Sequence, residues 1–516
     1  MFKRLVPVIA NTLHLPSRVL TSFLIASCAV GWPLQATFAK ENYLPNSGKN
    51  GSQPDKKNPS APAPDRFVHF NGKLEKVTPI DGGPGIVVCD PVCKDAKDDM
   101  PDMSRGCSAW LQFAIGGQPQ FGKTPFWRSI RRVQLQMKRQ DLRFENTKEA
   151  GKFATFLGAT HILLGSTSGS AKNCTLSYQL YKVSNMSPVG EAITITGTQT
   201  ELRNQLPKIA GLICRTLQIK PEHLPAAAPA IPELVLIGKV QARQLETSTE
   251  KLRAELRQLH SSSAIANFLY LDTATPHDPF LKETLDTLIT QETSNAIVIG
   301  EVGWLEGKVL HFYARRMENC FKTYPKNYLF KSAAVYYYRG LGNNKQALEA
   351  AKECVQLAPL NPDAWLTLAQ SYNQSADSLR AGRFRGAMTE EERIELEKLY
   401  PCWLGAAERA VFIDPLFAKA WLRVSTAAAY GGFLEEADRA FEQAITLERE
   451  RYNTYVWGLQ LYQAKWCNKP EKLQRVALTA ASDPSLNEAD KKNLAQTVQQ
   501  LPEIAKLITG QKTAAR

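Results

Sequence analysis

Residues 359–372 have the sequence PLNPDAWLTLAQSY, and residues 415–430 have the related sequence PLFAKAWLRVSTAAAY. In each stretch a proline precedes a tryptophan by six positions, and small and large apolar residues follow at helical spacing. Small residues let two helices approach closely, while the tryptophan fills the gap to the next pair. Helix pairs of this kind bury a continuous core only by stacking, and the stack leaves a concave face free for partners. The pattern therefore predicts an array of helical hairpins that binds something.

The spacing resembles the 34-residue tetratricopeptide repeat. Counted in that repeat, three units follow one another at residues 328–361, 362–415 and 416–449. The second unit contains an insertion, residues 375–396, because its tryptophan and that of the third unit are 56 rather than 34 positions apart. The signature positions of the three units are occupied by Tyr338, Ala347, Ala351 and Cys354, by Trp365, Leu368, Ala369 and Tyr372, and by Trp421, Ala437, Phe441 and Ala444.

Helical periodicity extends the array in both directions. Residues 232–327 are interpreted as degenerate helical repeats, and the part of 328–505 beyond residue 449 as an atypical unit with capping helices. Within the insertion, Thr389 and Glu392 have the spacing of a capping box, which predicts a helix starting at Glu390. An Ala/Pro linker, residues 221–231, separates the array from the preceding domain.

Residues 67–220 are predicted to form a small α/β domain. The apolar run Trp110–Ile115 is interpreted as a strand, and His161–Ser166 as another. Period-two alternation in Thr175–Val183 and again around Ile193 predicts an antiparallel hairpin. The expected fold class is therefore multidomain, α/β followed by all-α: a small α/β domain with an antiparallel hairpin and then a solenoid of the tetratricopeptide type.

The α/β segment also resembles a known family. The sequence FLGATHILLGS at residues 156–166, the following hairpin with Gly190 and Gly197, and the final helix are similar to the TolB-like or curli-secretion (CsgG-like) domain. That domain often precedes tetratricopeptide repeats in bacterial envelope and signalling proteins. The resemblance implies a structural or assembly module rather than a catalytic one.

The N-terminus indicates export. Residues 1–39 combine an early positive charge, the 14-residue apolar run Val19–Trp32 and a small-residue cleavage site ending at Ala39, which is the layout of a secretory signal. We therefore expect a periplasmic or secreted protein. Two alternatives are a lipoprotein tethered through Cys28, which follows a lipobox-like sequence, and an uncleaved N-terminal anchor. Residues 40–66 contain five prolines and little apolar sequence, and are interpreted as a disordered linker.

The chain has a formal net charge of +13, which favours anionic partners without choosing among them. A basic run at residues 127–143 could touch an anionic surface or polymer, although a solvated helix face is the simpler interpretation. No nucleic-acid-binding motif accompanies the charge, so no specific nucleic acid is expected. The cationic residues of the run are Arg128, Arg131, Arg132, Lys138, Arg139 and Arg143.

One stretch fits a nucleotide-binding loop. The sequence GQPQFGKT, residues 117–124, has the spacing of a P-loop, in which Gly117 and Gly122 would shape the loop, Lys123 would meet phosphates and Thr124 a magnesium ion. Pro119 weighs against this hypothesis, because it removes one of the backbone N–H donors that such a loop presents. A nucleoside triphosphatase is accordingly kept only as an alternative function, beside an oligomerising envelope assembly or secretion component.

No other chemistry is indicated. Cys89, Cys93 and Cys107 are interpreted as a disulfide region rather than a metal site, because no second ligand pair accompanies them. The histidines match no hydrolase signature, and neither a cofactor nor a metal is expected.

The main hypothesis is a non-catalytic extracytoplasmic scaffold that binds a protein or peptide partner in the groove of the solenoid. Positions 2, 5, 9 and 12 of the first helix in each repeat usually point into that groove. The residues predicted to bind the partner are Tyr336, Arg339, Gln370, Asn373, Lys419, Leu422 and Thr426.

Overall fold

The computed structural model describes residues 72–74, 77–95, 97, 99–139, 141–222, 224–243, 254–259, 263–273, 280–291, 295–304, 310–383, 385–447, 452–483, 486 and 488–509. The predicted signal, the linker at 40–66 and Cys28 lie outside these residues. The described chain forms two compact units: one lies within Pro62–Arg449 with Lys465–Cys467, and the other within Glu450–Ala464 and Asn468–Arg516. Within the described ranges, no helix has both the length and the apolarity needed to cross a membrane.

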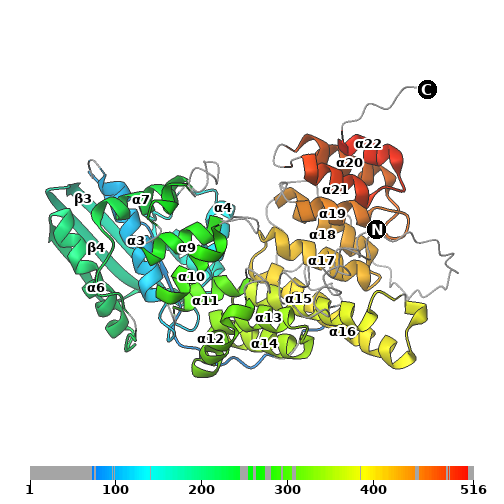
Figure 1. The fold of residues 1–516 in the computed structure, drawn as a ribbon, viewed down its shortest axis with the longest axis horizontal. Coiled ribbons are helices and arrows are strands. Elements are labelled where there is room, and N and C mark those ends of the chain that lie inside the picture. The colour runs from blue at the N-terminus through cyan, green and yellow to red at the C-terminus, as the bar shows by residue number, and fades with distance from the viewer. Residues whose placement is uncertain are drawn as a thin grey trace, which may run out of the picture. The chain divides into compact units, whose positions relative to one another are not determined.

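The N-terminal part of the first unit contains a mixed sheet (Figure 1). Strands β1 (Ile86–Val88) and β2 (Val92–Lys94) pair in parallel with successive stretches of one edge of β3 (His161–Ser170). On the other edge, β3, β4 (Asn173–Lys182) and β5 (Ser187–Gly197) form an antiparallel meander. The predicted hairpin is therefore confirmed, and the sheet buries apolar side chains beneath helices.

Helix α3 (Met100–Gly116) corrects the predicted strand Trp110–Ile115, since these residues form its last turns. Nearly every residue of α3 is buried, so its sequence lacks the polar face by which a helix is recognised, and a short apolar run does not distinguish the two structures. Helix α6 (Gln199–Thr216) packs beside it against the sheet. Helices α4 (Trp127–Gln136) and α5 (Thr147–Phe156) complete this part.

Helix α7 (Ile231–Arg243) packs on α3, whereas the sequence placed residues 232–243 among the degenerate repeats. The reason is a pair of glycines at the crossing. A Cβ atom on Gly106 would lie 1.9 Å from the carbonyl oxygen of Leu234, and one on Gly238 would lie 1.8 Å from that of Asp102. The two backbones touch, so α7 is held by the α/β part of the chain.

Among the described residues, helices α9 (Ala264–Thr273), α10 (Leu281–Gln291), α11 (Ala296–Trp304) and α12 (Leu310–Thr323) precede the regular repeats. Helix α9 pairs with α10, while α11 and α12 both contact the first regular repeat.

The repeats are the predicted helical hairpins. They consist of α13 (Tyr328–Gly340) with α14 (Asn344–Leu357), α15 (Pro362–Arg380) with α16 (Glu390–Ile413), and α17 (Ala418–Tyr430) with α18 (Leu434–Leu447). The indole Nε1 of Trp365 donates to the carbonyl of Pro359 at 2.9 Å, and that of Trp421 to Pro415 at 2.8 Å. These hydrogen bonds explain the proline–tryptophan spacing of the sequence.

The insertion lengthens α15 and α16 beyond their neighbours. It also contains the short 3₁₀ helix η3 (Arg385–Ala387) and a small apolar cluster of Ala376, Met388 and Leu396. The capping box is present, with the Thr389 side chain accepting from the Glu392 backbone and Glu392 accepting from the Thr389 backbone.

The C-terminal unit contains α19 (Tyr452–Leu461), α20 (Pro470–Ser482), α21 (Glu488–Thr497) and α22 (Pro502–Thr509). Its core includes a buried hydrogen bond of 2.6 Å from the Tyr455 hydroxyl to the carboxylate of Asp483.

Residues 72–74 and 77–80, which we call the N-terminal strap, run along second helices of the repeats. The backbone N–H of Lys73 donates to the carbonyl of Pro401 in α16 at 2.8 Å, and that of Ile80 donates to Gln356 in α14 at 2.9 Å. Gly72 and Gly405 meet backbone to backbone, because a Cβ on Gly72 would lie 2.6 Å from the Gly405 Cα. The strap therefore covers part of the surface of α14 and α16.

Candidate functional site

The predicted groove residues all lie on the first helices α13, α15 and α17, and all seven are partly exposed. We call the surface formed by Tyr336, Arg339, Gln370, Asn373, Lys419, Leu422 and Thr426 the first-helix surface. The three helices are neighbours in the order α13, α15, α17, as stacked repeats require.

Two contacts organise this surface. The guanidinium of Arg339 lies 5.5 Å from the ring centroid of Tyr336, and its Nε donates to the side-chain oxygen of Gln374 on α15. The hydroxyl of Thr426 donates to the Leu422 carbonyl of its own helix at 2.8 Å, so it is engaged within α17. The side chains of Gln370 and Asn373 have no hydrogen bond among the described residues, which leaves their amides available to a ligand.

Arg423 on α17 belongs to this surface but was missed by the sequence reasoning. Burial, and then the like charge of Arg339, lower its pKa, while Tyr336 and Asp377 act in the opposite direction. Its Nε atom is buried and has no hydrogen-bond partner among the described residues. The repeat pattern came within one residue of Arg423, which directly follows Leu422 at groove position 5 of the third repeat.

An aromatic cluster lies beside the end of α17. The ring of Tyr430 is 5.7 Å from that of Trp403 and 5.2 Å from that of Trp466, and the guanidinium of Arg380 lies 5.3 Å from its centroid. Trp403 is fully buried, so the cluster is chiefly packing between repeats. Arg380 is a second cation, after Arg423, that the seven predicted groove residues do not include.

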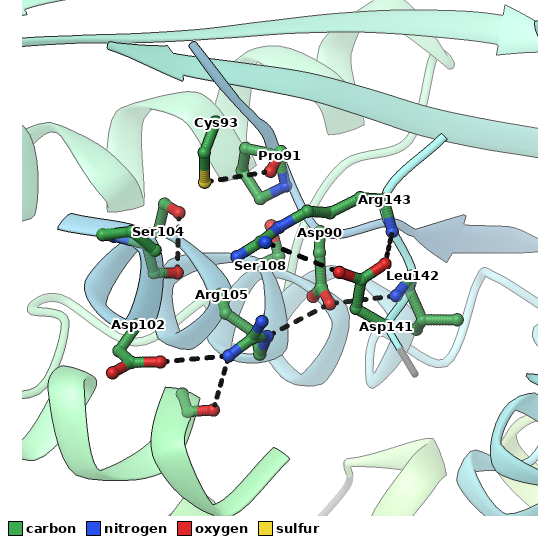
Figure 2. A network of polar contacts seen from close by, with 12 residues as sticks. Asp90, Pro91, Cys93, Asp102, Ser104, Arg105, Ser108, Asp141, Leu142 and Arg143 are labelled. Atoms are coloured by element: carbon green, nitrogen blue, oxygen red, sulfur yellow. Dashed lines mark hydrogen bonds and ion pairs between the residues drawn. The ribbon is translucent and has the colours of Figure 1, made fainter. Parts of the chain in front are cut away.

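A second candidate lies at the carboxyl end of β1, where the polar network of Figure 2 surrounds Asp90. The Asp90 carboxylate forms an ion pair with the Arg105 Nε at 3.4 Å and accepts from the Leu142 N–H at 3.1 Å. Arg105 also donates to Asp102 at 3.0 Å and to the carbonyl of Gly238 at 3.3 Å. Burial raises the pKa of Asp90, although Arg105 opposes it. The network joins α3, α7 and the loop at residue 142, so we assign it a structural role.

Next to this network is an open depression of about 540 Å³ lined by Val92, Cys93, Arg139, Asp141, Arg143, Glu145, Asn146 and Glu149. Its cations face acids: Arg139 pairs with Glu149 at 3.0 Å, and Arg143 with Asp141 at 3.5 Å.

Three of the six cations in the basic run 127–143, Arg132, Arg139 and Arg143, thus pair with acids, which argues against its proposed contact with an anionic surface. Arg132 is also committed, because it pairs with Asp363 at 3.0 Å and with Asp414, and lies over the Phe417 ring at 3.7 Å. The sequence could not show this, since the acids lie far along the chain in α15 and after α16.

The P-loop alternative is not supported by the geometry. Residues 117–124 follow helix α3 instead of a strand, and Lys123 pairs with Asp81 at 3.6 Å. The carbonyl of Gly117 accepts from Ala296 at the start of α11, and that of Gly122 accepts from Tyr328 at the start of α13. Thr124 is buried. The loop therefore connects the α/β part to the helices and has no exposed row of N–H donors.

The predicted disulfide is also wrong for this structure, because all nine described cysteines are free thiols. Cys89 and Cys107 are buried, and burial raises the pKa of Cys107 to about 12. Over the ranges that the structure covers, no group of three or more His, Cys, Asp or Glu side chains could hold a metal ion.

No protein-family model and no curated protein matches the chain. Among solved structures, it is similar to a human IFIT1 dimer with m7Gppp-AAAA, at 15% identity and a TM-score of 0.38, over 60% of this chain and 76% of that one. It is also similar to TTC0263, a thermophilic TPR protein of Thermus thermophilus, at 16% identity and a TM-score of 0.33, over 40% of this chain and 99% of that one. Likenesses at this level carry no argument about ligands. The helix pairs themselves define an α-solenoid of the tetratricopeptide type attached to a small mixed sheet.

Proposed function

We propose that this protein is a non-catalytic scaffold that binds a protein or peptide partner on the first-helix surface. The observation that carries the proposal is the unequal covering of the repeats. The N-terminal strap occupies part of the second helices α14 and α16. Helix α4 contacts the start of the first helix α15 through Asp363, but the seven predicted groove residues on α13, α15 and α17 remain partly exposed. A stacked array offers its first helices as the concave binding face.

The α/β part supports this surface mechanically. Its helix α4 contacts two successive repeats, through Ser129 to Asp363 at 2.8 Å and through Gln136 to the carbonyl of Leu416 at 2.8 Å. These contacts fix the angle between repeats, and a fixed surface loses less conformational entropy when a partner binds. We propose that the same α/β part docks the array to an envelope partner, as its resemblance to TolB-like and CsgG-like domains implies.

We further propose an extracytoplasmic location, which rests on the signal-like composition of residues 1–39.

Site-specific photo-crosslinking tests the binding function. A photoreactive amino acid would replace Gln370 or Asn373 in the full chain, and in a matched control it would replace Gln443, which is exposed on the second helix α18. After illumination in the producing cells, we expect covalent adducts with another protein at 370 and 373 but not at 443. Equal labelling at all three positions, or none, would contradict the proposed surface.

A further inference from the structure

The N-terminal strap crosses helix α16 directly over a carboxyl group. A Cβ atom on Gly72 would lie 2.6 Å from the Cα of Gly405, and it would collide with Oε2 of Glu408, three residues further along the same helix. The other carboxyl oxygen, Oε1, is buried and has no hydrogen-bond partner among the described residues. One end of the strap therefore covers the Glu408 side chain.

Within the described ranges, no cation compensates this carboxyl group, and Glu408 forms no ion pair there. Burial alone raises its pKa to about 8. The charged groups on the elements that pack around it do not alter that pKa: Lys73 of the strap, Asp377 and Arg380 of α15, Arg409 of α16 and Arg423 of α17.

Ionisation of Glu408 opposes the closed position of the strap. A carboxylate beneath Gly72 loses hydration and gains no hydrogen bond, whereas release of the strap would give it water. Once exposed, the group returns to its ordinary pKa of 4.5. The closed strap is therefore fully stabilised below pH 4.5, and this stabilisation is lost as the pH rises towards 8.

The attachment of the strap allows local opening. Among the described residues, two backbone hydrogen bonds hold it to the second helices, from Lys73 to Pro401 and from Ile80 to Gln356. Leu74, beside the first of them, is 52% exposed and buries little apolar area. Segments with few buried apolar contacts open at a lower free energy than the core. Residues 72–74 can thus separate from α16 while the repeats stay folded.

We propose that Glu408 is a pH-sensitive switch of the strap: residues 72–74 stay closed on α16 while its carboxyl group is protonated, and they leave the helix when it ionises. Release uncovers the surface of α16 around Pro401 and Gly405 and does not change the first-helix surface. The inference goes beyond the proposed function and does not depend on any partner.

Hydrogen exchange of the full chain, followed by mass spectrometry, tests the switch. Each observed exchange rate is compared with the chemical rate of the same amide at the same pH, so the resulting protection factor reports opening alone. We expect the protection factor of the Lys73 amide to fall more than about tenfold between pH 5.5 and 7.5. The Ile80 amide, at the other end of the strap, is the internal reference and should change less.

Glu408→Gln removes the ionisable group and retains its size. This variant should keep the Lys73 protection factor at the wild-type value of pH 5.5 across the whole range. The matched control is Glu395→Gln at an exposed position of the same helix, which should retain the wild-type fall.

Gly72→Ala opens the switch by another route, because its methyl group would collide with Glu408 and with the Gly405 backbone. It should lower the Lys73 protection factor already at pH 5.5. The proposal would be overturned by a protection factor that is the same at both pH values, or by a fall that persists in Glu408→Gln. An equal change at Lys73 and Ile80 would also overturn it, because Glu408 would then act on the whole fold.

Discussion

Arg132 of helix α4 forms an ion pair with Asp414, a residue 282 positions further along the chain whose carboxylate has no exposed area. The same guanidinium pairs with Asp363, so one side chain joins the α/β part to both ends of the repeat at residues 362–415. Burial holds the pKa of Asp414 above its ordinary value even though Arg132 opposes it. The pair therefore contributes to stability mainly because each charge would be strongly unfavourable alone.

Replacement of Arg132 by methionine should lower the free energy of unfolding by about 3–5 kcal/mol, because it leaves two carboxylates without their cation. The matched control is Arg139→Met, which removes a more exposed pair with Glu149 and should cost about 1 kcal/mol or less. Urea denaturation of the full chain followed by circular dichroism measures both. Equal stability of the two variants would contradict the assigned role of Arg132.

Glu408 should make the unfolding free energy fall as the pH rises. Burial raises the pKa of this carboxyl from 4.5 to about 8, and its Oε1 has no hydrogen-bond partner among the described residues. Between pH 4.5 and 8 the folded protein keeps the proton that the unfolded chain has released, so stability declines across that window. Glu408→Gln should raise the free energy of unfolding at pH 8 by about 1–3 kcal/mol and make the decline between pH 4.5 and 8 shallower.

The control for this measurement is Glu395→Gln, an exposed position on the same helix. It should leave the pH dependence of urea denaturation unchanged. The role assigned to Glu408 would be refuted if the wild-type free energy of unfolding rose between pH 5 and 8 and Glu408→Gln left that pH dependence unchanged.

Gly106→Ala should separate α3 from α7, because its new methyl group would meet the carbonyl oxygen of Leu234. We expect a loss of about 3 kcal/mol or more, since a backbone contact cannot move aside as a side chain can. Gly386→Ala is the matched control, because nothing lies within 4 Å of its added methyl group. Thermal unfolding of both variants measures the difference, and equal Tm values would show that the crossing tolerates a wider separation.

In the folded protein, partly exposed cysteines should react with a thiol-labelling reagent and buried cysteines should not. Cys93 is partly exposed and should react with iodoacetamide in the folded protein, whereas burial raises the pKa of Cys107 to about 12 and should protect it. Denaturation without a reductant should then expose Cys89 and Cys107 as reactive thiols, measured by peptide mass spectrometry. Recovery of these two as a disulfide would restore the prediction made from the sequence.

The hypothesis of a secretory signal at residues 1–39 predicts the N-terminus of the mature protein. Cleavage after Ala39 would give a mature protein that begins at Lys40, measured as intact mass and N-terminal sequence from the producing cells. A lipidated N-terminus at Cys28 would favour the tethered alternative, and an intact chain recovered in the cytoplasm would refute the proposed location.

The parts that could be predicted from sequence are those fixed by local spacing. The Pro359–Trp365 interval, the Thr389 capping box and the alternating strand of Thr175–Val183 each reflect contacts within a few residues or one turn of structure. Helix α3 was mistaken for a strand because burial on all sides removed its polar face.

Long-range pairing was beyond the sequence alone. The acids that neutralise Arg132 are more than two hundred positions away, so the basic run appeared free. Repeat position was enough to place the seven predicted groove residues on first helices, but Arg423 lies one residue outside the positions that were counted.

The N-terminal strap constrains how such a chain can change in evolution. Its backbone hydrogen bonds to Gln356 in α14 and to Pro401 in α16 join two consecutive hairpins, so the length of the strap must match their separation. Close packing of Gly72 against Gly405 fixes the position of the strap on the second hairpin. Duplication or deletion of a hairpin between these anchors would break the match of lengths. A related chain with a different number of hairpins should therefore gain or lose them only beyond Leu416, where the strap makes no backbone hydrogen bond.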